Sequence, residues 1–116
     1  MRLKAEIRDG VGVLRPQGRF VTGSDDELGS ARKYLEENGI NRAVIDFSAV
    51  PYIDSTGLAF VVELHKALAS RGGQLFVTNV NERVREVLEM TRIDRVIAMW
   101  PDATEAEATL RAGAAC

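Results

Sequence analysis

The sequence has little of what metal centres, disulfide frameworks and membrane proteins need. Its 116 residues include one cysteine, Cys116, and one histidine, His65. Such a pair can form neither a disulfide framework nor a Cys/His metal cluster. No apolar run approaches the length of a membrane span, and the opening residues lack the apolar core of a signal peptide. We therefore expect a reduced, cytoplasmic protein that holds no metal ion and does not insert directly into a membrane.

A surplus of charge of one sign is also lacking. Fifteen Lys and Arg residues stand against 17 Asp and Glu residues, which gives a formal net charge of −2. Domains that bind nucleic acid usually carry a clear positive surplus, so we expect no nucleic-acid partner. Apolar residues make up 46% of the chain and charged residues 28%, and both shares are close to the average for a single globular domain.

The hydrophobic pattern predicts strands that alternate with helices. Two alternating segments flank Asp9-Gly10, a dipeptide typical of a two-residue hairpin turn. Short runs rich in strand-forming residues occupy 42–47, 74–78 and 96–100, and helical spacing occupies 24–38, 56–70, 81–91 and 102–110. The predicted fold is a single α/β domain with a mainly parallel sheet of four to five strands, an antiparallel N-terminal hairpin strand and about four helices. We place this domain at residues 1–111 and a short flexible tail at residues 112–116.

The common enzyme templates do not fit this sequence. Residues 18–24 have the outer glycine spacing of a phosphate-binding loop but lack the lysine that contacts the terminal phosphates. His65 lies in the middle of a predicted helix, about 15 Å of helical rise beyond Ser55, whereas a catalytic pair needs hydrogen-bond contact. Asp46 and Asp54 can lie near one edge of the sheet, but no oxyanion donor or metal ligand accompanies them. We predict neither catalytic activity nor a cofactor.

The most informative segment is residues 54–58, Asp-Ser-Thr-Gly-Leu. Ser55 falls in the loop after a buried strand and at the start of a helix, where an open α/β sheet meets ligands and modifications. Ser55 is either a helix N-cap, which accepts a backbone N–H, or a phosphorylation site. A phosphate there would carry about −1.5 to −2 charges and would face the positive end of a helix dipole. The two roles are compatible.

The neighbours of Ser55 suggest a surface for a partner protein. Asp54 would oppose a phosphate or shape the loop, and Gly57 would leave the first helical turn open to a close approach. A helical wheel places Leu58 and Val62 on the apolar face and points Phe60 away from it. Phe60 is therefore either an exposed anchor for a partner or a side chain that a neighbouring helix covers.

Residues 44–97, VIDFSAVPYIDSTGLAFVVELHKALASRGGQLFVTNVNERVREVLEMTRIDRVI, resemble the STAS domain, specifically the small bacterial anti-sigma factor antagonists. The resemblance extends over nearly the whole chain. Its most specific element is the family motif Asp-Ser-(Ser/Thr)-Gly, which Asp54, Ser55, Thr56 and Gly57 match completely. One position departs from the family, because Val21 stands where many members carry an acidic residue near the motif serine.

The resemblance implies a phosphorylation-controlled exchange of partners. The unphosphorylated form would bind an anti-sigma factor that is also a serine-protein kinase, and this would release a sigma factor. The kinase would then phosphorylate Ser55 and dissociate, and a serine phosphatase of the metal-dependent class would remove the phosphate. Around Ser55, the expected switch-loop and partner-binding residues are Asp54, Thr56, Gly57, Leu58 and Phe60. The alternative is a stand-alone STAS scaffold subunit in a signalling assembly or a lipid-transport complex.

Overall fold

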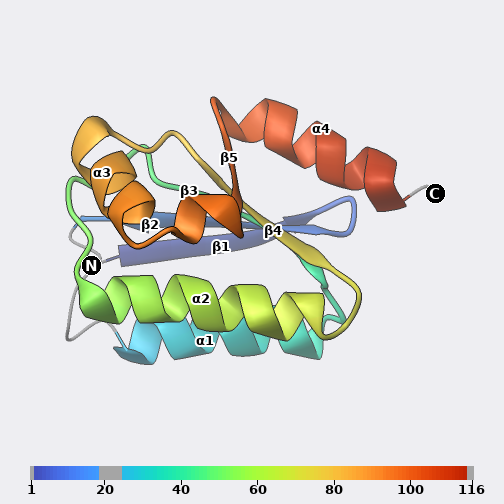
Figure 1. The fold of residues 1–116 in the computed structure, drawn as a ribbon. Coiled ribbons are helices and arrows are strands. Elements are labelled where there is room, and N and C mark those ends of the chain that lie inside the picture. Colours follow the sequence, from blue (N-terminus) through green and yellow to red (C-terminus); the bar gives the residue numbers. More distant parts are fainter. Residues whose placement is uncertain (1, 19–24, 115–116) are drawn as a thin grey trace.

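The computed structural model describes the backbone of residues 2–18 and 25–114. The elements run in the order β1 (Arg2–Arg8), β2 (Val11–Gln17), α1 (Asp25–Glu37), β3 (Arg42–Asp46), α2 (Ser55–Ala69), β4 (Gln74–Thr78), α3 (Glu82–Met90), the 3₁₀ helix η1 (Ile93–Arg95), β5 (Ala98–Trp100) and α4 (Ala103–Ala114). The five strands form one sheet in the order β1-β2-β3-β4-β5, in which β1 is antiparallel to β2 and the other pairs are parallel (Figure 1). The predicted α/β fold with its N-terminal hairpin is confirmed.

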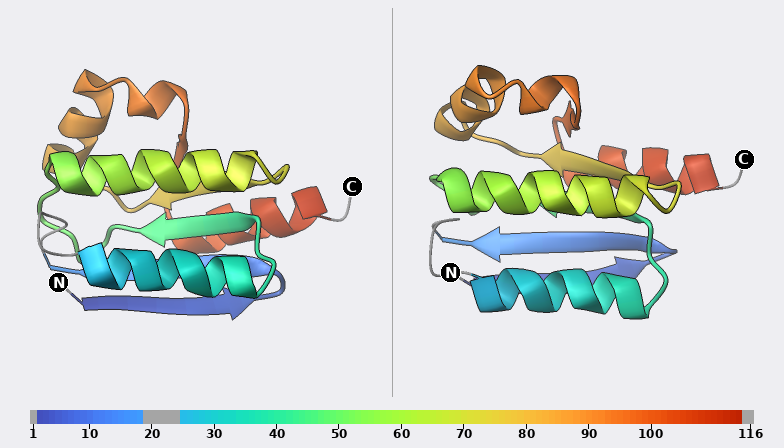
Figure 2. Two further views of the ribbon diagram at one scale, coloured as in Figure 1. Left: turned by 90° about the horizontal axis from the view of Figure 1, so that it is seen from below. Right: turned by 60° about the horizontal axis from the view of Figure 1, so that its bottom comes forward.

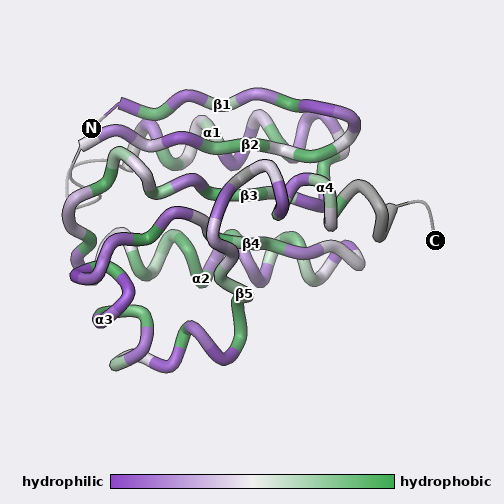
Figure 3. The backbone as a smooth tube through the Cα atoms, turned by 90° about the horizontal axis from the view of Figure 1, so that it is seen from above, coloured by the Kyte–Doolittle hydropathy of each residue, from purple (hydrophilic) through white to green (hydrophobic). Residues whose placement is uncertain are grey.

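Helices α1 and α2 lie side by side on one face of the sheet, and α4 lies on the other (Figures 1 and 2). Alternation along each strand divides the apolar side chains between these two faces. In β3, Ile45 belongs to the large core cluster under α1, α2 and α3, whereas Val44 belongs to a smaller cluster with Leu110 of α4. Figure 3 shows hydrophilic and hydrophobic residues alternating along the edge strand β1, whereas β3 and β4, which are covered on both faces, are hydrophobic in their middle.

Tight turns close the edge of the sheet at which the parallel strands begin. The predicted hairpin turn is present, and both of its central residues are left-handed, with φ of 50° at Asp9 and 80° at Gly10. The turns before β3 and β4 likewise contain left-handed glycines, Gly39 and Gly72, with φ of 67° and 75°. Among the described residues, no helix is long and apolar enough to cross a membrane.

Two predicted boundaries differ from the structure. The strand expected at residues 96–100 is shorter, because η1 precedes it and pairing with β4 begins only at Ala98. Helix α4 continues to Ala114 and so includes residues 112–114, which were expected in the tail. Residues 115–116, most of the loop at 18–24 and Val21 lie outside the described residues.

The phosphorylation loop between β3 and α2

Residues 47–54 connect β3 to α2 at the edge of the sheet where the parallel strands end (Figure 1). They are here called the phosphorylation loop after the predicted phosphorylation site, Ser55, which follows them. Asp46, which is 8% exposed, fixes the start of this loop. Its Oδ1 accepts hydrogen bonds from the backbone N–H of Ser48 at 2.9 Å and from the side-chain amide of Asn79 at 3.0 Å. Asp46 at the end of β3 and Asn79 just after β4 therefore fix the conformation in which the loop leaves the sheet.

A short ion network ties Asp46 to the hairpin. Arg15 of β2 places Nε 3.7 Å from Oδ2 of Asp46 and donates a hydrogen bond through Nη1 to Glu6 of β1. The hydrogen bond from Arg15, together with a second one from Arg8, lowers the pKa of the Glu6 carboxyl below its ordinary value. These charges lie on the sheet face opposite α1 and α2, where no residue of the phosphorylation motif is found.

The end of the phosphorylation loop is fixed by Asp54, the N-cap of α2. Its backbone is extended, with φ of −109° and ψ of −171°, as an N-cap requires. Oδ1 of Asp54 accepts hydrogen bonds from the backbone N–H groups of Thr56 at 2.9 Å and Gly57 at 3.1 Å. The interpretation of Ser55 as the cap was therefore wrong, because the carboxylate one residue earlier accepts the N–H groups of the first turn.

Ser55 is the first residue of α2 and is exposed. No hydrogen bond joins its hydroxyl to any residue within 2–18 or 25–114. A phosphate added to this oxygen would thus displace no cap and would lie at the positive end of the α2 dipole. The geometry gives Ser55 both access for an enzyme and tolerance for the added charge.

The other predicted partner-binding residues are less accessible than expected. Asp54, Thr56 and Leu58 are half-buried, and Leu58 packs against the large core cluster. Gly57 is buried, so it leaves no open surface for a close approach. Phe60 is only 8% exposed, and the interpretation of Phe60 as an exposed anchor was wrong.

The buried face of α2 is rotated from the one that the wheel predicted. Its buried residues are Gly57, Phe60, Val61, Leu64 and Leu68, whereas Leu58 and Val62 lie at its flank. The reason is that α2 packs against α1 as well as against the sheet. Phe60 lines a groove of about 270 Å³ between the two helices, opposite Leu28 and Arg32 of α1. The neighbouring helix covers Phe60, which was the other interpretation left open by the sequence.

Sequence reasoning missed a bond between the phosphorylation loop and the next helix. Asn81 is the N-cap of α3, and its Oδ1 accepts a hydrogen bond from the N–H of Val84 at 2.8 Å. Its Nδ2 donates in addition to the carbonyl oxygens of Val50 and Pro51, at 3.2 and 3.3 Å. One asparagine thus joins the phosphorylation loop to the start of α3, and a strong cap signal in the sequence does not reveal the second role.

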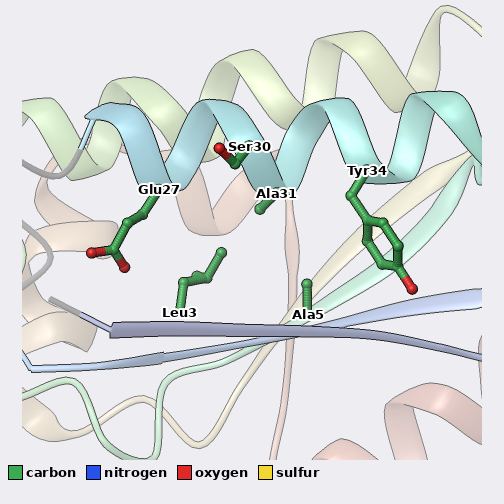
Figure 4. Close-up of a pocket in the computed structure, with 6 residues that line it drawn as sticks. All are labelled: Leu3, Ala5, Glu27, Ser30, Ala31 and Tyr34. Carbon is green, nitrogen blue, oxygen red and sulfur yellow. The ribbon is translucent and has the colours of Figure 1, made fainter.

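A second groove lies away from the phosphorylation loop, between β1 and α1 (Figure 4). Its volume is about 320 Å³, and it is lined by Leu3, Ala5, Glu27, Ser30, Ala31 and Tyr34. The side chains from β1 are apolar, and the carboxylate of Glu27 and the phenol of Tyr34 stand at its two ends (Figure 4). It contains none of the residues that the sequence singled out.

The groups considered for catalysis are held apart by the fold. His65 lies well along α2 and is half-buried. Asp46 and Asp54 border the same loop, but the hydrogen bonds described above commit both carboxylates to backbone N–H groups. Within the described residues, no three His, Cys, Asp or Glu side chains are grouped so that they could hold a metal ion.

Comparison with known protein families gives one extended match. The family model described as the STAS domain matches residues 2–108. A proposed anti-sigma factor antagonist of Thermotoga maritima is 33% identical over 73 residues, which cover 63% of this chain and 65% of the relative. The chain therefore aligns with slightly less than two thirds of that relative. A proposed anti-sigma factor antagonist of Bordetella bronchiseptica, BtrV, is 29% identical over 97% of this chain and 94% of its own length.

Solved structures show the same architecture. A proposed anti-sigma factor antagonist from Thermotoga maritima, TM1081, superposes with a TM-score of 0.81 at 26% identity, over 94% of each chain. The anti-sigma factor antagonist SpoIIAA shares the fold at 20% identity in its unphosphorylated form, with a TM-score of 0.73 over 96% of this chain and 97% of that one. The phosphorylated Bacillus SpoIIAA shares it at 15% identity, with a TM-score of 0.74 over 93% and 97%.

Proposed function

Since the chain belongs to the STAS domain family, we propose that it is an anti-sigma factor antagonist whose partner binding is controlled by phosphorylation of Ser55. Unphosphorylated, it binds an anti-sigma factor and thereby frees a sigma factor. That anti-sigma factor is also the serine-protein kinase that phosphorylates Ser55, and a metal-dependent serine phosphatase reverses the modification. The exchange takes place in the cytoplasm, and the chain itself performs no catalysis.

One observation carries this proposal: the motif serine is exposed while its neighbour Asp54 caps the helix. A serine that caps its own helix would change the acceptor of those N–H groups on phosphorylation, so the fold itself would respond to the phosphate. Here the cap is independent of the serine hydroxyl, because Oδ1 of Asp54 accepts both N–H groups. The added charge should therefore change the affinity for a protein that contacts the loop more than it changes the stability of the fold.

The size of the effect follows from electrostatics. A phosphate brings about two negative charges into a contact from which water is excluded, and this costs several kcal/mol where no opposite charge compensates it. Each 1.4 kcal/mol is a tenfold change in affinity, so a loss of about a hundredfold or more is expected. The likeness of this fold to both forms of SpoIIAA supports a phosphate that acts without remodelling the domain.

The proposal is tested by phosphosite mapping and by binding. Protein isolated from its own cells should carry phosphate on Ser55 in some growth states. Towards the serine-kinase anti-sigma factor of the same cell, Ser55→Ala should bind like the wild type, and Ser55→Glu should bind more weakly. Ser70→Glu is the matched control, since it adds the same charge to an exposed serine just beyond the opposite end of α2. Absence of phosphate in every growth state, with equal binding by all variants, would leave the chain as a constitutive scaffold.

A further inference from the structure

Tyr52 is an exposed aromatic side chain in the phosphorylation loop, three residues before Ser55. In the part of the chain that the structure describes, four large hydrophobic side chains are exposed: Tyr34 at 39%, Tyr52 at 40%, Met90 at 83% and Val96 at 62%. Of these four, Tyr52 alone belongs to the phosphorylation loop. Tyr52, close to the predicted phosphorylation site, is thus accessible to a partner in the way that was expected of Phe60.

Arg83 lies over the face of this ring. The guanidinium carbon of Arg83, in the first turn of α3, is 5.8 Å from the centre of the Tyr52 ring, which is within the range of a cation–π interaction. Arg83 is itself exposed, as are Pro51 and Ser55. Exposed side chains thus lie at Pro51, Tyr52 and Ser55 of one short segment, and the guanidinium of Arg83 joins them from a separate segment.

This surface is held in place before any partner binds. The side-chain amide of Asn81 fastens the carbonyl groups of Val50 and Pro51 to the start of α3, one residue away from Tyr52 on one side and two residues from Arg83 on the other. A loop whose backbone is already ordered loses less conformational entropy on association, so more of its contact energy contributes to affinity. Tyr and Arg are also the residue types most often found at the energetic centre of protein interfaces.

We propose that Tyr52 and Arg83 form the anchor by which the anti-sigma factor of the proposed function contacts this protein. This inference rests on that function and names the surface that serves it. The partner presents an apolar pocket to the ring of Tyr52 and a carboxylate to Arg83. A phosphate on Ser55, three residues from Tyr52, would add negative charge to the same contact and would repel that carboxylate. The same contact then explains both binding and release.

The test measures the affinity of the recombinant anti-sigma factor for four variants. Tyr52→Ala should weaken binding at least about tenfold, and Arg83→Ala by about three- to tenfold. Tyr34→Ala is the matched control, because Tyr34 is equally exposed but lies on α1 beside the groove of Figure 4, and it should bind within about twofold of the wild type. Tyr52→Phe keeps the ring and should also bind like the wild type.

The possible outcomes separate the two proposals. If Ser55→Glu weakens binding but Tyr52→Ala and Tyr34→Ala both bind like the wild type, the anchor is refuted while the proposed function stands. If the wild type does not bind the anti-sigma factor, both fail. If Tyr52→Ala abolishes self-association in sedimentation while partner binding is unchanged, the surface serves a second copy of the chain, and the anchor is again refuted. Urea unfolding of each variant checks that the exposed substitutions leave the fold intact.

Discussion

The turns where the parallel strands begin and the loops where they end are stabilised in different ways. Below, the first are called the glycine edge and the second the polar edge. At the edge where the strands begin, left-handed glycines make the turns, with φ of 80° at Gly10, 67° at Gly39 and 75° at Gly72. At the edge where the strands end, the side chains of Asp46, Asp54, Asn79 and Asn81 hydrogen-bond to one another or to the backbone. The first edge reverses the chain in little space, and the second holds an exposed loop in one conformation. Only the second has the accessible hydroxyl of Ser55.

The largest expected effect of a single substitution belongs to the glycine edge. A Cβ built at Gly73 would lie 1.6 Å from the carbonyl oxygen of Asn41, the atom that accepts the hydrogen bond from the N–H of Gln74. Because backbone would have to move, Gly73→Ala should lower the free energy of unfolding by about 3 kcal/mol or more, measured by urea denaturation.

Gly29→Ala is the control for this substitution. Gly29 lies within α1, and a Cβ there would meet nothing within 4 Å. The substitution should raise the free energy of unfolding by about 0.5–1 kcal/mol, since alanine loses less entropy in a helix. If Gly73→Ala unfolds at the same urea concentration as the wild type, the account of this edge is wrong.

The next largest change in the free energy of unfolding is expected at the polar edge, from loss of the N-cap of α2. Asp54→Ala removes the acceptor of two N–H groups and should lower the free energy of unfolding by about 1–2 kcal/mol. Amide hydrogen exchange at Thr56 and Gly57 should accelerate. Asp54→Asn keeps an acceptor oxygen in the same place, so it should stay within about 0.5 kcal/mol of the wild type. Equal stability of the alanine and asparagine variants would show that the cap is dispensable.

These two edges also differ in how far the sequence predicts them. Glycine and Asp-Gly turns are local signals, and for this reason the hairpin, the alternation of strands and helices and the single α/β domain followed from the pattern. Ser55 was found in the same way, by its motif and its place after a buried strand. The cap was assigned one residue too late, because Asp54 and Ser55 are both good capping residues and only the extended backbone of Asp54 decides between them.

Contacts between elements distant in sequence were not predictable. Phe60 was placed on the wrong side of α2 because the wheel considers one helix, whereas α1 supplies a second buried face. The bond from Asn81 to the phosphorylation loop joins residues 31 and 30 positions apart, and no local pattern records it. Tyr52 attracted no attention in the sequence, because its exposure and its contact with Arg83 exist only in the folded protein.

The smallest effect expected here separates the two roles of Asn81. Asn81→Asp keeps the oxygen that accepts from Val84 but loses the amide that donates to Val50 and Pro51. It should cost about 1 kcal/mol and should speed amide exchange in the phosphorylation loop. Asn81→Ala loses the cap as well and should cost about 1 kcal/mol more. If Asn81→Asp exchanges and unfolds like the wild type, the bond to the loop contributes nothing.

The central claim is that the phosphate at Ser55 acts on the partner and leaves the fold unchanged. The most direct measurement uses one preparation that carries phosphoserine at position 55, and compares it with the unmodified protein in partner affinity and in urea unfolding. We predict that the anti-sigma factor binds about a hundredfold or more weakly, while the free energy of unfolding changes by less than about 1 kcal/mol. Unchanged affinity, or a loss of affinity accompanied by an equal loss of stability, would contradict the claim.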